Sequence, residues 1–229
     1  MITLYIDKTI NFCKWPFALL CCLAVYPIIT NSLDVFHVWY GNIDTMFWVG
    51  FIGYILLYRY IFSARIWGSW LPTFEHELTH AIFAVATLHS VTDFHTSYKS
   101  GGHIRYIGGE GNWLITIAPY IFPTTLGLTI LLFPYLKQYE WVWIFVGVVF
   151  AFQYISTYRE VHSQQPDLQE VGFFFALIVI PTCNILSMSL VMAWMNGGLQ
   201  EMIVLLLHIG NDTEEFANQI LMEWRNMYL

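Results

Sequence analysis

Long apolar runs alternate with short polar connections through most of the chain. A helix needs about 17–25 apolar residues to cross a bilayer, and several runs approach or reach that length. They are Trp15–Thr30, Met46–Ser63, Ile66–Leu88, Trp113–Leu136, Trp141–Tyr158 and Val171–Met195. The connections between them are Asn31–Thr45, His89–Asn112, Lys137–Glu140 and Arg159–Glu170. The pattern predicts an all-α polytopic membrane protein with about six transmembrane helices.

The pattern changes after the last run. Asn196-Gly197-Gly198 is expected to break the helix, and Leu199–Ile209 is too short to span a bilayer. Further on, apolar residues recur every three or four positions among charged ones, at Phe216, Ile220, Trp224 and Met227. Residues 197–229 are therefore predicted to form an amphipathic tail on the membrane surface or on the helix bundle.

Composition agrees with a membrane location and excludes two other classes of protein. Of the 229 residues 57% are hydrophobic and only 11% are charged, against roughly 25% charged in soluble domains. Such a chain is too hydrophobic for intrinsic disorder. Nine basic residues in a chain of net charge −7 provide no basic face, so nucleic-acid binding is not expected.

One apolar run contains a cluster of ionisable residues. Glu75, His76, Glu77 and His80 lie within six positions of the third run, and a charge inside a membrane helix costs about 2.5–3.5 kcal/mol on insertion scales. Histidines four residues apart share a helix face and can bind one metal ion. In this His-Glu-x-x-His spacing Glu77 reaches a water on that ion and serves as general base, whereas Glu75 lies beside the site or on the helix surface. The cluster predicts a hydrolytic zinc site.

A third zinc ligand must come from elsewhere in the chain, because catalytic zinc normally has three protein ligands. Glu110, in a Gly-rich segment, and the loop residues His95 and His103 are alternatives. The favoured residue is Asp167. If the fourth and fifth runs each cross the membrane once, Asp167 begins the sixth helix on the side of the membrane that His80 approaches. Pro166 before it suits a helix start, so a helix-capping role for Asp167 is the competing interpretation.

These residues resemble a known family. The intramembrane His76-Glu77-x-x-His80, a Gly-rich connection after it, and Pro166-Asp167 entering a later helix resemble the site-2 protease family of intramembrane zinc metalloproteases, and most closely its small bacterial membrane-peptidase branch. The likeness runs from about Trp70 to Met195. Within it, Gly101–Tyr106 is similar to the family's membrane-associated β-hairpin, and Gly111–Tyr120 to its small-residue and proline helix.

The resemblance implies a function and a site. Zn²⁺ would be held by His76, His80 and Asp167, with Glu77 as the catalytic base. Residues 1–196 would form an integral membrane metalloprotease domain with its core at about 66–195, in the bacterial inner membrane. The substrate would be a transmembrane segment or signal-peptide remnant of another protein. Such a helix must unwind before hydrolysis, and we hypothesise that the unwound strand pairs with the hairpin.

Two other functions compete with proteolysis. Membrane di-iron hydroxylases also use spaced histidines, but they need several histidine boxes with adjacent pairs, and the eight histidines here include no such pair. A transporter or membrane scaffold could hold a structural metal or none at this motif. Transporters tend to show repeated halves, and the chain has no internal repeat.

Overall fold

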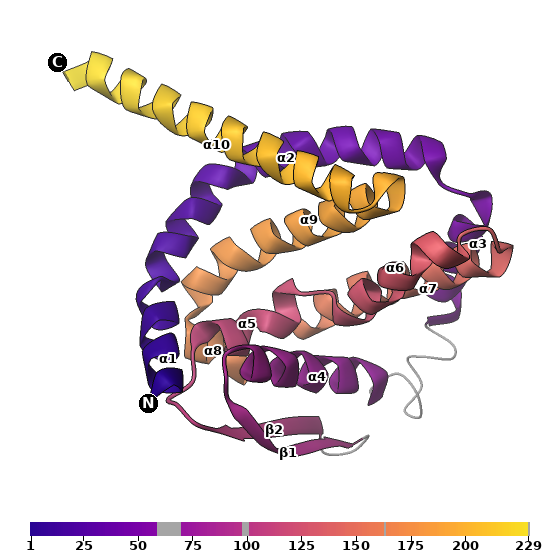
Figure 1. Ribbon diagram of the computed structural model, residues 1–229, viewed down its shortest axis with the longest axis horizontal. Helices are drawn as coiled ribbons and strands as arrows, with labels where there is room; N and C mark the ends of the chain where they lie inside the picture. The colour runs from indigo at the N-terminus through magenta and orange to yellow at the C-terminus, as the bar shows by residue number, and fades with distance from the viewer. Residues whose placement is uncertain (59–69, 98–100, 163, 229) are drawn as a thin grey trace.

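The computed structural model describes residues 1–58, 70–97, 101–162 and 164–228. Most of these residues are helical, and one antiparallel hairpin follows the fourth helix (Figure 1). The elements are α1 (Ile2–Phe12), α2 (Lys14–Asn42), α3 (Thr45–Leu57), α4 (Trp70–Ala86), β1 (Ser90–Ser97), β2 (Gly101–Ile107), α5 (Trp113–Ile121), α6 (Thr124–Leu136), α7 (Glu140–Glu160), α8 (Pro166–Val171), α9 (Phe173–Gly197) and α10 (Leu199–Tyr228).

Among the residues that the structure describes, three helices are long and apolar enough to cross a membrane. These are α2, α7 and α9, and the bent pair of α5 and α6 makes a fourth if it counts as one span. The apolar helix α3 has 13 residues and α4 has 17, and the predicted ends of their runs at Ser63 and Ile66 lie outside the described residues. The α-helical membrane architecture agrees with the sequence, but the predicted count of about six spans is not confirmed.

The predicted connection Asn31–Thr45 is wrong, because α2 continues as helix to Asn42. The first polar residue of this stretch, Asn31, has partners within the bundle. The side-chain amide of Asn31 donates to the carbonyl of Pro27 at 3.0 Å and to Asp212 of α10 at 2.6 Å. Asn31 therefore joins two helices rather than marking a loop.

The run Trp113–Leu136 is not one straight helix, because α5 and α6 meet at an angle of 60°. Pro123 lies at the break, where it lacks an amide hydrogen and disfavours helix in the residue before it. A buried carboxylate caps the start of α6: Oε1 of Glu75 accepts a 2.7 Å hydrogen bond from the backbone N–H of Thr125. Glu75 is only 6% exposed, so of its two predicted places, beside the site or on the helix surface, the second is wrong.

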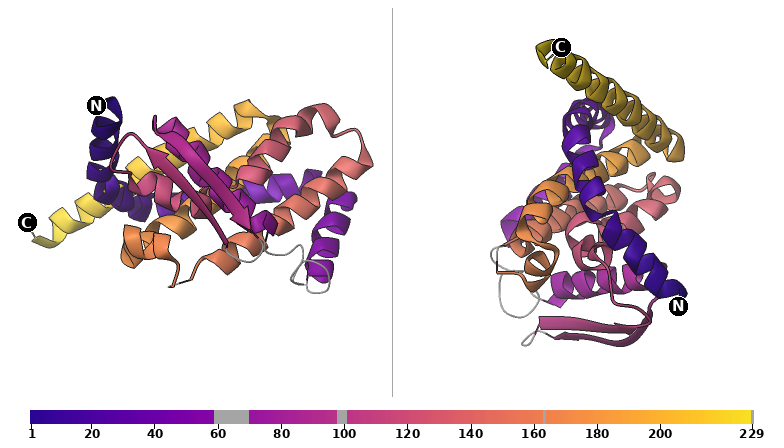
Figure 2. Two further views of the ribbon diagram at one scale, coloured as in Figure 1. Left: turned by 90° about the horizontal axis from the view of Figure 1, so that it is seen from below. Right: turned by 90° about the vertical axis from the view of Figure 1, so that its left-hand side faces the viewer.

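The hairpin lies along α4 (Figures 1 and 2). Ser90 pairs with Ile107 and Ser97 with Gly101, and the register shifts between Val91 and Asp93. The hairpin expected from the family resemblance is thus present, and β2 contains the predicted segment Gly101–Tyr106.

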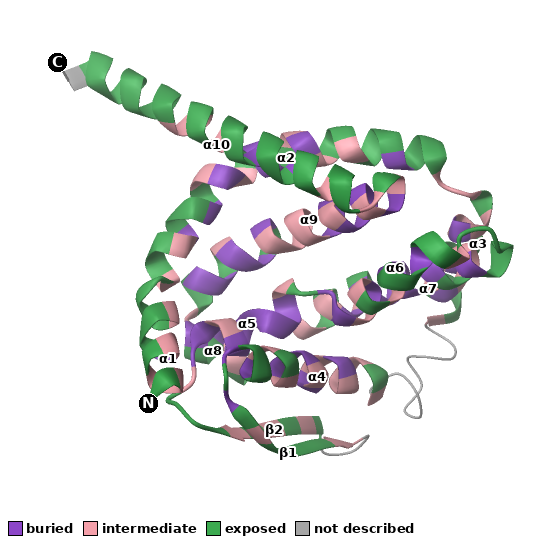
Figure 3. Cartoon of the chain, viewed as in Figure 1, coloured by how far each residue is buried: buried purple, intermediate pink, exposed green. Residues whose placement is uncertain are grey.

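The N-terminal part of α10 packs on the helix bundle. Gly198, with φ +71°, ends α9, as the Asn-Gly-Gly sequence predicts. Leu205 and Ile209 of α10 are buried against Ala24, Ile28 and Ala193 of α2 and α9. Beyond them α10 continues as one helix, and its C-terminal part is largely exposed (Figure 3).

Candidate metal centre

Helix α4 positions two histidines on one face. His76 and His80 lie one turn apart, and their Nε2 atoms are 3.1 Å from each other. His80 is buried, and the side chain of His76 is only 12% exposed. The spacing in the sequence thus produces the convergence expected of two ligands to one ion.

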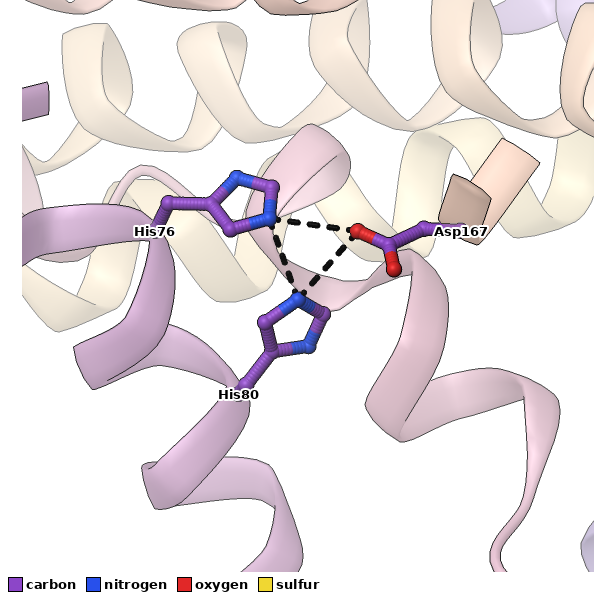
Figure 4. Close-up of side chains that lie close together, drawn as sticks. All are labelled: His76, His80 and Asp167. Atoms are coloured by element: carbon purple, nitrogen blue, oxygen red, sulfur yellow. Dashed lines mark hydrogen bonds and ion pairs between the residues drawn. The ribbon is translucent and has the colours of Figure 1, made fainter. Parts of the chain in front are cut away.

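Asp167 approaches both histidines from a distant part of the chain. Its Oδ2 atom lies 3.2 Å from Nε2 of His76 and 3.4 Å from Nε2 of His80 (Figure 4). It belongs to the short helix α8, with Pro166 in the first turn, and α8 ends at Val171 before Gly172 at φ +86°. The prediction that Asp167 begins the sixth membrane helix is wrong, because α8 is a separate turn before α9.

The ring nitrogens that face away from this triad have partners of their own, and the carboxylate oxygen that faces it has one further partner. Nδ1 of His76 lies 3.0 Å from Oε2 of Glu160, and Nδ1 of His80 lies 2.8 Å from the backbone carbonyl of Ile115. The hydroxyl of Tyr120 donates to Oδ2 of Asp167 at 3.0 Å. An acceptor at each Nδ1 favours the tautomer that leaves Nε2 free to bind a metal.

These atoms fit zinc. Two imidazole nitrogens and a carboxylate oxygen are a ligand set that catalytic zinc uses, and the three atoms lie within 4.8 Å of one another. Ligand atoms about 2.0–2.1 Å from one tetrahedral ion are about 3.3 Å apart. The distances here are 3.1, 3.2 and 3.4 Å. The group can therefore hold a metal ion with little movement.

The charge state of Asp167 also suits a ligand. Burial raises the pKa of this carboxyl, but its hydrogen bonds with His76 and His80 outweigh that effect and hold the pKa below its usual range. Asp167 is therefore a carboxylate at neutral pH, the form that binds metal.

Glu77 lies at the same cavity as the triad. The cavity has a volume of about 350 Å³, and its lining includes Glu77, the three triad residues and part of β2. Strand β2 comes very close here, because a Cβ atom on Gly102 would lie 2.5 Å from Cγ and 2.7 Å from Oε1 of Glu77. Glu77 thus faces the space beside the ligand atoms and is covered by the hairpin.

The other candidates for a third ligand lie elsewhere. Glu110 is exposed in the loop after β2. His103 lines the cavity, but its Nε2 lies 3.2 Å from Oδ2 of Asp93. The ring of His95 packs against that of His103, with centroids 5.5 Å apart. None of these three belongs to the metal-ligating group found among the described residues.

The sequence does not predict that Glu160 and Tyr120 contact the candidate ligands. Both lie in or next to apolar runs, and nothing in their spacing relates them to the histidines. The weak signal for Glu160 is an acid at the end of a membrane helix, seven residues before Asp167.

Residues 46–212 match the family model described as Peptidase M50B-like. This segment covers well over half of the chain and contains all four of His76, Glu77, His80 and Asp167. No curated protein and no solved structure matches the chain.

Proposed function

Because the chain belongs to the Peptidase M50B-like family, which is the site-2 protease family, we propose that it is a zinc-dependent metalloendopeptidase of the membrane. It would hydrolyse peptide bonds in or near transmembrane segments of other proteins. The observation that carries this proposal is the convergence of His76, His80 and Asp167 at the cavity that Glu77 also lines. Glu77 is then the catalytic residue of the reaction.

His76, His80 and Asp167 would hold the zinc ion, and Glu160, the Ile115 carbonyl and Tyr120 orient them. Zinc, when bound, supplies a Lewis acid that polarises the scissile carbonyl and lowers the pKa of the attacking water. Glu77 takes a proton from that water as it attacks, and then gives the proton to the leaving amine. Glu77 is only 8% exposed, so few water molecules from bulk solvent can form hydrogen bonds with its carboxylate.

The substrate that we propose is a transmembrane segment or a signal-peptide remnant, met within the lipid bilayer, here the bacterial inner membrane. The peptide bonds of a membrane helix are hidden in its own hydrogen bonds, so the helix must unwind to be cut. Ile104 and Tyr106 of β2 line the cavity, which supports pairing of the unwound strand with the hairpin. Ile104→Pro should therefore raise KM for a membrane substrate. An unchanged KM would count against pairing of the substrate with the hairpin.

The deciding experiment replaces Glu77 with Gln. The purified variant, reconstituted with zinc in liposomes beside a single-span reporter protein, should keep one zinc per chain by elemental analysis. Its cleavage rate should fall by about 10²–10⁴-fold, because general acid–base catalysis contributes about that much. The matched control is Glu223→Gln, the same change at an exposed position of α10, which should cleave normally.

The result also separates the proposal from its alternative. Zinc binding with full biological activity in the Glu77→Gln protein would exclude the protease and favour a transporter or scaffold with a structural metal.

A further inference from the structure

The N-terminal helix α1 buries a single acidic side chain. Asp7 is 0% exposed and is the buried residue of α1, whereas Ile2 and Tyr5 are exposed. Burying a carboxylate is costly unless hydrogen bonds or charges compensate it. The metal centre does not use Asp7, so its burial needs another explanation.

The partners of Asp7 come from both ends of the hairpin. Before β1, Nε2 of His89 lies 3.2 Å from Oδ2 of Asp7. After β2, the backbone N–H groups of Glu110 and Gly111 donate to the same oxygen at 3.0 and 3.1 Å. The side chain is closely enclosed, because a Cβ atom on Gly109 would lie 2.0 Å from Oδ2.

The other carboxylate oxygen holds the start of α5. Oδ1 of Asp7 accepts a 2.7 Å hydrogen bond from the amide of Asn112, whose own Oδ1 caps α5 by accepting from the N–H of Ile115 at 3.2 Å. The carbonyl of Ile115 is the partner of Nδ1 of His80. A continuous series of contacts thus leads from α1 to a candidate metal ligand.

The same contacts reach the cavity wall. The ring of His89 packs edge-on against that of Tyr106, with centroids 5.0 Å apart. Tyr106 lines the cavity, as do Gly102 and Ile104 of the same strand. The position of β2 over Glu77 therefore depends on how the two ends of the hairpin are held.

We propose that Asp7 is a positioning residue for the proposed protease reaction: by binding both ends of the hairpin and the start of α5, it fixes the hairpin as the wall of the substrate cavity. Asp7 lies outside the segment 46–212 that matches the family model. The inference rests on the proposed function for its effect on catalysis, but not for its effect on the hairpin.

Asp7→Asn tests the role, because it removes the charge and replaces one acceptor with a donor that faces N–H groups. Backbone hydrogen exchange in β1 and β2 should quicken by about ten-fold or more, as expected when hydrogen bonds to a charged acceptor are lost. Exchange in α9 should not change. KM for a membrane substrate should rise by about ten-fold with a smaller change in kcat, because Glu77 and the zinc ligands remain in place. Asp34→Asn, the same change at an exposed site on α2, should alter none of these.

A second variant reaches the same contact without changing charge. Gly109→Ala places a methyl group against Oδ2 of Asp7 and should loosen the hairpin in the same way. Unchanged hairpin exchange in both variants overturns the inference, whatever happens to Glu77→Gln. Exchange that quickens equally in α9 also overturns it, since Asp7 would then support the whole fold rather than the hairpin. If Glu77→Gln abolishes cleavage but neither Asp7→Asn nor Gly109→Ala changes hydrogen exchange in the hairpin, the proposed protease function is kept and the positioning role of Asp7 is excluded.

Discussion

At the scale of single residues, Glu160 illustrates how the ligands are held. It lies at the end of α7, and Oε2 is 3.0 Å from Nδ1 of His76. A carboxylate at the far nitrogen of a metal-binding histidine fixes the ring and increases its basicity. In the proposed zinc site, Glu160 would therefore contribute to the affinity for the ion without touching it.

Glu160→Gln should weaken zinc binding by about 10–100-fold, the usual effect of losing such a partner. The affinity can be measured by competition with a chromophoric chelator. Glu140→Gln, at the exposed opposite end of the same helix, is the matched control and should bind zinc normally. Equal affinities in the two variants would mean that the contact with His76 does not support the metal.

Residue-level prediction from the sequence worked where helical spacing alone brings side chains together. His76 and His80 converge because they are one turn apart, and no tertiary contact is needed. Asp167 required a topological argument, which predicted that it lies near the histidines but assigned it to the wrong element. Glu160 and Tyr120 could not be found, since only the tertiary contacts of Glu160 with His76 and of Tyr120 with Asp167 bring them to the site.

At the scale of elements, two glycines allow α3 and α7 to pack closely. A Cβ atom on Gly50 would lie 1.9 Å from the carbonyl oxygen of Ile144, and one on Gly147 would lie 2.1 Å from that of Phe47. Small residues at such crossings bring helix backbones together in membrane proteins. The close approach buries Phe47 and Val146 in the largest apolar cluster.

Gly50→Ala should therefore destabilise the protein by about 1–3 kcal/mol, the usual cost of overpacking. Gly53→Ala, in the same helix but with nothing within 4 Å of the new methyl group, should be neutral or stabilising by up to about 1 kcal/mol. Unfolding by SDS in mixed micelles, followed by circular dichroism, measures both. Equal stabilities would contradict the close packing.

The elements themselves were predicted unevenly. Apolar runs located α7 and α9 well, because length and hydropathy determine such helices. The apolar run does not predict the bend between α5 and α6, because hydropathy is insensitive to Pro123 and the carboxylate that binds the start of α6 comes from another helix. The continuation of α2 to Asn42 is not predicted for a similar reason, because the partner of Asn31 lies on α10.

At the scale of the whole molecule, the candidate metal centre joins two distant parts of the chain. His76 and His80 lie on α4, next to the hairpin and α5, whereas Asp167 lies on α8 beside α9. Three polar side chains enclosed at this junction are costly without a partner. An ion bound by all three would offset part of that free-energy cost and fix α8 against α4.

Zinc should consequently stabilise the folded protein, because a ligand that binds only the native state adds RT ln(1 + [L]/Kd). At a free zinc concentration 100 times Kd the gain is about 2.7 kcal/mol, and a chelator should remove it. Thermal unfolding in detergent measures this difference, and the Glu77→Gln background prevents self-cleavage. Adding His80→Ala should abolish the shift, whereas Glu223→Gln should retain it.

Asp167→Ala tests whether the ion connects the two parts of the chain. A zinc-dependent shift of full size in that variant would show that the ion binds α4 alone and does not fix α8.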